Sequence, residues 1–260
     1  MPIWKEATLV GFDTETTGLS ISEDRIFEVG LTTFENGELI EDWDTLIDPS
    51  REMSKVSIEK TGVDPSELVG KPLFSAIVDE VLNRIQGRIV VGYNSLGFDI
   101  PLLEAELARV NRTMPECRVI DVLVFAKGLV RKGGHKLGEM IKHYGLTMDT
   151  AHRASADAAA TVRLLLAMAP DLPPDLDDLI TLQAQWRQEQ RAKRAVWRKR
   201  PGDAGSGQDS LLRQEYAPAS SLVDSDGKVT LGPGYLYGTE TDPIRAFIGA
   251  YLSLGGGSGK

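Results

Sequence analysis

Hydrophobic positions in the first 170 residues alternate between strand-like and helix-like spacing. Short apolar runs bounded by turn residues predict buried strands, and apolar residues repeating at i, i+3 and i+4 predict helices. Asn36-Gly37, between two such runs, predicts a hairpin turn. The predicted strands are Ala7–Phe12, Ile26–Phe34, Glu38–Ile47, Ile89–Tyr93 and Val119–Ile120, and the predicted helices are Phe74–Ile85, Pro101–Val110, Val122–Leu129, Leu137–His143 and Ala154–Met168. This order predicts an α/β fold with a mixed sheet flanked by helices.

The rest of the chain has a different character. Pro170 and the acidic, proline-bearing stretch after it predict the end of the first domain. Near the C-terminus, apolar residues share one helical face and predict an interaction or dimerisation element: Ile244, Phe247, Ile248, Tyr251 and Leu252. The predicted organisation is a domain at 1–170, a basic helix within 171–200, a Gly/Ser/Ala-rich linker at 201–221 and a small C-terminal segment at 222–260.

Composition narrows the class of protein. The 260 residues include 29 Lys and Arg against 38 Asp and Glu, a net charge of −9, and 42% hydrophobic residues, as in ordinary globular proteins. No run approaches the ~18 apolar residues of a membrane helix, and the N-terminus lacks the pattern of a signal peptide. A single cysteine, Cys117, excludes an internal disulfide. We therefore expect a cytoplasmic protein with no membrane partner.

The first chemical signal is the pair Asp13 and Glu15, where the first predicted strand ends. Side chains alternate across a strand, so these carboxylates project from one face, about 7 Å apart along the chain. They repel each other, and bound cations offset that repulsion. A strand end carrying solvated acids is the alternative interpretation.

A second acid, Asp99, follows a predicted strand and lies at or near the first turn of the next helix. An acid at this position also complements the helix N-terminus, so by itself it does not require a functional site. Phe98, directly before it, is expected either to pack in the core or to line a pocket.

A third acid, Asp157, interrupts a helix of small, apolar residues, where an unpaired carboxylate is costly to bury. His152 precedes it by five residues, about 140° away on an ideal helix, so the two share a site only if His152 lies in the loop before the helix. Ser155 as the helix cap would allow that placement.

Together these segments resemble the DEDDh 3′–5′ exonucleases, a ribonuclease H-like family that includes the proofreading epsilon subunit of bacterial replicative DNA polymerase. The matching motifs are D-x-E-T-T-G-L from Asp13, N-x3-F-D from Asn94 and H-x-A-x-x-D from His152, in the family's order. The resemblance covers roughly residues 5–170. It implies a ribonuclease H-like fold for this part of the chain.

The resemblance also implies the roles of individual residues. Asp13, Glu15, Asp99 and Asp157 would be catalytic ligands of two Mg²⁺ or Mn²⁺ ions, which prefer hard oxygen ligands. His152 would be the general base, because its unperturbed pKa of about 6.5 suits proton removal near neutral pH. The expected substrate-binding residues are Thr14, Thr16, Leu19, Asn94 and Phe98.

Basic residues occur in two places where a polyanion could bind. Lys127, Arg131, Lys132 and Lys136 surround Gly133-Gly134 and are expected to contact a nucleic-acid backbone. Residues 171–200 carry seven basic and five acidic residues, and the helix predicted there from about Leu179 to Arg200 holds all seven basic residues with one acid, Trp186 and Trp197. The tryptophans are expected to pack on the first domain, and stacking on single-stranded nucleic acid is the alternative.

The sequence therefore predicts a metal-dependent 3′–5′ exonuclease that releases nucleoside 5′-monophosphates from DNA ends, single-stranded or frayed, in proofreading, repair or end trimming. One alternative substrate is RNA, because the same acids and histidine serve both polymers. A different kind of alternative is a binding subunit of a polymerase or repair complex, tethered through its C-terminal segment, which could also form a homodimer.

Overall fold

The computed structural model describes residues 3–148 and 153–198, and its strands form one mixed sheet. The strand order is β3-β2-β1-β4-β5. β1 pairs antiparallel with β2 and parallel with β4, β2 pairs antiparallel with β3, and β4 pairs parallel with β5. The bounds are β1 Leu9–Thr16, β2 Ile26–Glu35, β3 Glu38–Leu46, β4 Ile89–Gly92 and β5 Arg118–Asp121.

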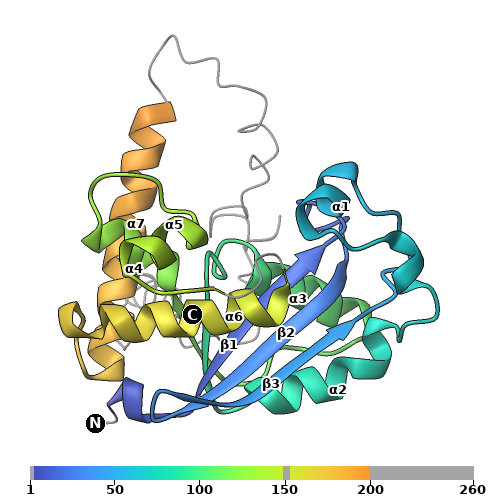
Figure 1. The fold of residues 1–260 in the computed structure, drawn as a ribbon, viewed down its shortest axis with the longest axis horizontal. Helices are drawn as coiled ribbons and strands as arrows, with labels where there is room; N and C mark the ends of the chain where they lie inside the picture. Colours follow the sequence, from blue (N-terminus) through green and yellow to red (C-terminus); the bar gives the residue numbers. More distant parts are fainter. Residues whose placement is uncertain (1–2, 149–152, 199–260) are drawn as a thin grey trace, which may run out of the picture.

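Helices cover both faces of the sheet (Figure 1). α6 crosses β1 and β2 on one face, in a core shared with α4, α5 and α7. α2 and α3 pack on the opposite face against alternate strand residues such as Val10 and Phe12. The bounds are α1 Lys55–Thr61, α2 Phe74–Ile85, α3 Asp99–Arg109, α4 Val122–Leu129, α5 Leu137–His143, α6 Ala154–Met168 and α7 Leu176–Arg198, with short 3₁₀ turns at Trp4–Glu6, Pro65–Leu68 and Ala169–Asp171.

Two glycines allow α6 to lie unusually close to the sheet. A side chain at Gly11 would collide with the carbonyl group of Ala158, and one at Gly30 would collide with the backbone of Ala154 and Ser155. The alanine-rich face of α6 has little side-chain volume to resist this approach. The depth of α6 in turn sets how close Asp157 comes to β1.

α7 packs on the domain rather than standing apart from it. Leu176, Leu179 and Ile180 are buried in the core that α6 also contributes to. The ring of Trp186 meets Phe125 edge to face, with 6.0 Å between the ring centroids. Packing of Trp186 is therefore confirmed, whereas the side chain of Trp197 and all of residues 201–260, with their predicted linker and interaction element, lie outside the described residues.

Most elements lie where the apolar pattern predicts them, and the hairpin turn places Asn36 and Gly37 at positive φ. β1 is longer than predicted, because its polar residues Asp13–Thr16 continue to pair with β2. α1 was not predicted; a side-chain cap from Ser54 begins it and left-handed Gly62 ends it. Within residues 3–148 and 153–198, no helix combines the length and apolar character needed to cross a membrane.

Candidate active site

Three carboxylates meet where β1 passes beneath the first turn of α6. Oxygen atoms of Asp13, Glu15 and Asp157 all lie within 4.8 Å of one another. Asp13 and Glu15 share the face of β1 that α6 covers, as period-two alternation predicts. Asp157 comes this close to them because Gly11 and Gly30, which have no side chains, allow α6 to pack closely on β1 and β2. Segments more than 140 residues apart in sequence thus supply one acidic cluster.

Asp99 lies beside this cluster but is not one of the three residues whose oxygen atoms lie within 4.8 Å of one another. It is the first residue of α3, which begins two residues before the predicted start, and so lies in the first turn as expected; the residue is 5% exposed. Its Oδ1 accepts a hydrogen bond from the hydroxyl of Thr14 at 2.7 Å, which links α3 to β1. Thr14 is therefore placed to orient a carboxylate, a contact that the sequence did not reveal.

The electrostatics of the cluster favour cations. Burial, and then the nearby carboxylates of Asp99, Glu15 and Asp157, raise the pKa of Asp13 well above its ordinary value. Burial is also the main reason that the pKa of Asp99 rises to about 7, although the hydrogen bond from Thr14 opposes the shift. Carboxylate oxygens in this density form a donor set suited to a hard divalent cation, which would relieve their repulsion.

Lys60 of α1 also contacts the cluster, and it was not among the predicted site residues. Its Nζ lies 3.2 Å and 3.4 Å from the two carboxylate oxygens of Glu15. The lysine side chain is 53% exposed, whereas that of Glu15 is 4% exposed. Burial has the largest single effect on the pKa of Lys60 and lowers it, but the nearby carboxylates, Glu15 foremost, together outweigh burial and raise the pKa above its ordinary value. No local spacing in the sequence relates Lys60 to the acids, because α1 is brought to them by tertiary packing.

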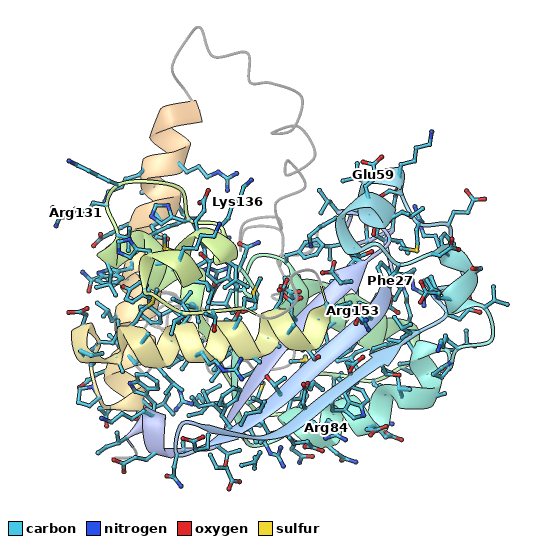
Figure 2. The ribbon with its side chains drawn as sticks, viewed as in Figure 1. Phe27, Glu59, Arg84, Arg131, Lys136 and Arg153 are labelled. Atoms are coloured by element: carbon cyan, nitrogen blue, oxygen red, sulfur yellow. The ribbon has the colours of Figure 1, made fainter. Side chains whose placement is uncertain are left out.

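The start of α6 is anchored by an ion pair that the sequence also did not reveal. Nε of Arg153, which is labelled in Figure 2, donates to buried Glu28 at 2.8 Å, and its Nη2 lies 3.6 Å from Asp44. Arg153 is the N-cap residue, so the prediction of Ser155 as the cap is wrong: the helix starts two residues earlier than a Ser155 cap would start it, and its first residues pack closely on Gly30. His152 lies outside the described residues, and its role stays a prediction.

The predicted substrate residues have different environments. Leu19 is 47% exposed and Asn94 is exposed, whereas Phe98 is half-buried against the α2/α3 core. Thr16 is buried, and its hydroxyl donates to the carbonyl oxygen of Gly18 at 2.7 Å, which shapes the turn that presents Leu19. Their contacts with a substrate stay predictions.

The four predicted backbone-contacting residues are exposed on α4 and on the segment that links it to α5. Figure 2 shows Arg131 and Lys136 on this segment. The hydroxyl of Tyr93, just after β4, donates to the carbonyl oxygen of His135 at 2.6 Å and ties the segment to the loop that precedes Asp99. The basic residues are thus connected to the site, although binding of nucleic acid by Lys127, Arg131, Lys132 and Lys136 stays a prediction.

Comparison with known families decides the class of this site. A model of the exonuclease family, RNase_T, matches residues 10–165, which is more than half of the chain and includes every acid of the cluster. The chain belongs to the exonuclease family. The prediction from the three motifs is thereby confirmed, and so is the predicted class of enzyme.

Curated relatives of this exonuclease include DNA polymerase III proteins. It is 32% identical over 193 residues to the PolC-type DNA polymerase III of Streptococcus agalactiae serotype III (strain NEM316), covering 73% of this chain but 13% of that protein. It is 32% identical over 169 residues to the DNA polymerase III subunit epsilon of Treponema pallidum (strain Nichols), covering 64% of this chain and 78% of that subunit. The chain therefore spans a small part of the PolC-type polymerases and most of the epsilon subunit.

Solved structures agree on the fold. Escherichia coli exonuclease I in complex with a dT13 oligonucleotide superposes with a TM-score of 0.56 at 19% identity, over 62% of this chain and 41% of that one. A likeness at this identity shows the fold, so the predicted mixed sheet flanked by helices is confirmed.

Proposed function

We propose that the chain is a 3′–5′ exonuclease that removes nucleoside 5′-monophosphates from the 3′ ends of single-stranded or frayed DNA. The observation that carries the proposal is the convergence of Asp13, Glu15 and Asp157 within 4.8 Å, with buried Asp99 beside them. Membership of the exonuclease family supports the same reaction.

Asp13, Glu15, Asp99 and Asp157 are proposed to hold two Mg²⁺ or Mn²⁺ ions. The raised pKa values of Asp13 and Asp99 support cation binding, because a nearby positive charge stabilises the ionised carboxylates. Two such ions, when bound, supply Lewis-acid stabilisation of the attacking and leaving oxygens of a phosphodiester.

The side chains around the acids are proposed to supply proton transfer and positioning. His152 accepts the proton of the attacking water, and Arg153, held by Glu28, fixes the start of the helix directly after it. Exposed Leu19 and half-buried Phe98 are proposed to contact the last bases, with Thr14, Thr16 and Asn94 completing the pocket.

DNA is proposed as the substrate because curated relatives are parts of DNA polymerase III, and E. coli exonuclease I is structurally similar in complex with dT13. The same relatives support a polymerase as partner, with attachment through residues 201–260. RNA is the competing substrate, since no described contact depends on the sugar. Attachment and dimerisation are measured by native mass spectrometry with and without a polymerase.

A parallel degradation assay tests the proposal. The full chain is incubated with 5′-labelled single-stranded DNA, frayed duplex DNA and RNA of one sequence, in Mg²⁺, Mn²⁺ or EDTA. We expect a ladder of products shortened from the 3′ end of DNA, release of nucleoside 5′-monophosphates and no reaction in EDTA. Faster cleavage of RNA than of DNA would show that RNA is the preferred substrate. Internal cleavage, or full activity in EDTA, would contradict the proposed reaction.

Substitution of His152 tests its role as base. His152→Ala is expected to lower the turnover number by about 10²–10⁴-fold and to leave Mn²⁺ binding unchanged, because the carboxylates remain. His143→Ala, on α5, is the matched control and should retain turnover. Equal turnover and equal pH profiles in the wild type and His152→Ala would contradict the assignment.

A further inference from the structure

The loop from β4 to α3, residues 93–98, leads directly into Asp99. The backbone N–H of Ile100 donates to the carbonyl oxygen of Ser95 at 2.9 Å, so the loop and the first turn of α3 are one hydrogen-bonded unit. Asn94 has a positive φ of 62°, a conformation that asparagine tolerates but that needs support from its surroundings. The position of Asp99 therefore depends on what holds this loop.

A buried carboxylate outside the acidic cluster accepts hydrogen bonds from the backbone of this loop. Asp121, at the end of β5, is 3% exposed. Its side chain accepts hydrogen bonds from the backbone N–H groups of Asn94 at 2.8 Å, Leu96 at 3.2 Å and Leu123 at 3.1 Å. One side chain thus ties the loop before α3 to the start of α4.

α7, which lies beyond the residues matched by the family, holds both Asp121 and the loop. Gln183 is 4% exposed; its Nε2 donates to the carbonyl oxygen of Val119 at 2.9 Å, and its Oε1 accepts from the N–H of Asp121 at 2.6 Å. These two contacts pair the carboxamide with the edge of β5, as a neighbouring strand would.

Arg187, one turn further along α7, contacts the loop directly. Its Nη2 donates to the carbonyl oxygen of Leu96 at 2.9 Å. Burial raises the pKa of Asp121, and the positive charge of Arg187 partly offsets that increase. The adjacent Trp186 lies so close to Gly128 that any side chain there would collide with its ring, which fixes the height of α7 over α4. Arg187 is half-buried, and the loop carbonyl it binds is three residues before Asp99.

We propose that Arg187 is a positioning residue for the exonuclease reaction: through the carbonyl group of Leu96, it holds the loop that sets the place of Asp99. The inference rests on the proposed function, because it assigns a role relative to a proposed catalytic carboxylate. It also gives α7 a role in the catalytic unit, beyond covering the apolar core. A displacement of about 1 Å in a catalytic group can lower a rate by roughly 10²-fold, so a modest shift of this loop has a measurable effect.

The test compares two arginines of the same helix in the full chain. Arg187→Met removes the hydrogen bond and the charge, while Arg191→Met removes the same charge from an exposed position one turn away. With a short single-stranded DNA and Mg²⁺, Arg187→Met is expected to lower kcat about tenfold with KM within twofold of wild type. Arg191→Met should leave kcat unchanged. Arg187→Lys, which keeps a donor, should recover part of kcat.

Hydrogen–deuterium exchange provides a readout independent of turnover. Amides of residues 94–100 should exchange faster in Arg187→Met than in wild type or Arg191→Met, while exchange in β1 and β2 stays the same. If Arg187→Met raises KM with kcat unchanged, Arg187 contacts substrate and the proposal is wrong. Unaltered kcat and exchange overturn it as well, as does global unfolding of both Arg187 variants. An inactive wild type would instead contradict the proposed function.

Discussion

Two groups of buried charged residues show opposite solutions to the burial of carboxylates. Glu106 of α3 is fully buried and meets two arginines: Arg25 donates from Nε and Nη2 at 2.7 Å and 3.0 Å, and Nη1 of Arg109 lies 3.1 Å away. The backbone N–H of Ile26 adds a contact at 3.3 Å. In the acidic cluster, by contrast, burial and then the carboxylates of Asp99, Glu15 and Asp157 raise the pKa of Asp13, and Lys60 contacts Glu15 from a half-exposed position.

The difference shows which buried charges serve the fold and which serve the chemistry. Around Glu106, positive charge is built into the chain, so the group is complete when the protein folds. Around Asp13, the fold holds carboxylates together at a free-energy cost that bound cations reduce. Mutation of Glu106 should therefore lower mainly the stability of the protein, whereas mutation of the acidic cluster should lower mainly its activity.

The largest expected effect is that of Asp13→Asn on turnover. Loss of this carboxylate should lower kcat on single-stranded DNA at least about 1,000-fold, since metal-ion catalysis supplies several kcal/mol. The free energy of unfolding in EDTA should stay equal or rise, because repulsion is relieved. Asp42→Asn, exposed on β3, is the control and should leave both quantities unchanged. Retained turnover would remove Asp13 from the site.

Glu106→Gln should show the opposite signature. It leaves two arginines without their buried carboxylate, and we expect a loss of about 2 kcal/mol in unfolding free energy, below the 3–5 kcal/mol of fully buried pairs because Arg25 and Arg109 are partly exposed. Turnover of the folded protein should stay within threefold of wild type. Urea unfolding measures the loss, with exposed Glu116→Gln as control. An unchanged free energy of unfolding would contradict the assignment of Glu106 and its arginines to the stability of the fold.

The pH dependence of stability sharpens the comparison in metal-free protein. The pKa of Asp99 is about 7 in the folded state and about 3.9 when unfolded, so between these values the folded state binds more protons. The free energy of unfolding in EDTA should therefore fall as pH rises from about 4 to 7. Asp99→Asn should flatten this part of the curve in urea titrations. Equal slopes in both proteins would contradict the assigned shift.

The smallest effect is expected for Lys60→Met. Removing this half-exposed cation from Glu15 should lower unfolding free energy in EDTA by less than about 1 kcal/mol. Saturating Mn²⁺ should abolish the difference from wild type, and the variant should bind Mn²⁺ more tightly because no ammonium group competes for Glu15. Lys55→Met, exposed at the start of α1, is the control. Weaker Mn²⁺ binding would show that Lys60 supports the cation site.

Periodic segments of the fold were predictable because their signal is local. The apolar face of α2 and the small residues of α6 give their bounds directly from the sequence. α1 has seven residues and depends on its caps, so periodicity could not reveal it. The polar end of β1 continues as a strand through pairing with β2, which local pattern does not encode.

The candidate site was predictable where motifs carry it, and not where tertiary contacts do. Alternation along β1 places Asp13 and Glu15 on one face, but the arrival of Asp157 depends on glycines beneath α6. Lys60 and Arg187 come from helices with no sequence spacing that relates them to the acids. Asp121, directly before a predicted helix, had a visible signal as a helix cap, and its Oδ1 does accept from the N–H of Leu123.

Direct measurement of Mn²⁺ binding tests the central claim, that the acidic cluster is a cation site because the fold leaves its carboxylates in mutual repulsion. Isothermal titration of Mn²⁺ into wild type, Asp13→Asn and Glu106→Gln separates the two groups of buried charges. We predict binding to wild type and Glu106→Gln, with loss of binding in Asp13→Asn. No binding to wild type, or equal binding to wild type and Asp13→Asn, would contradict the account.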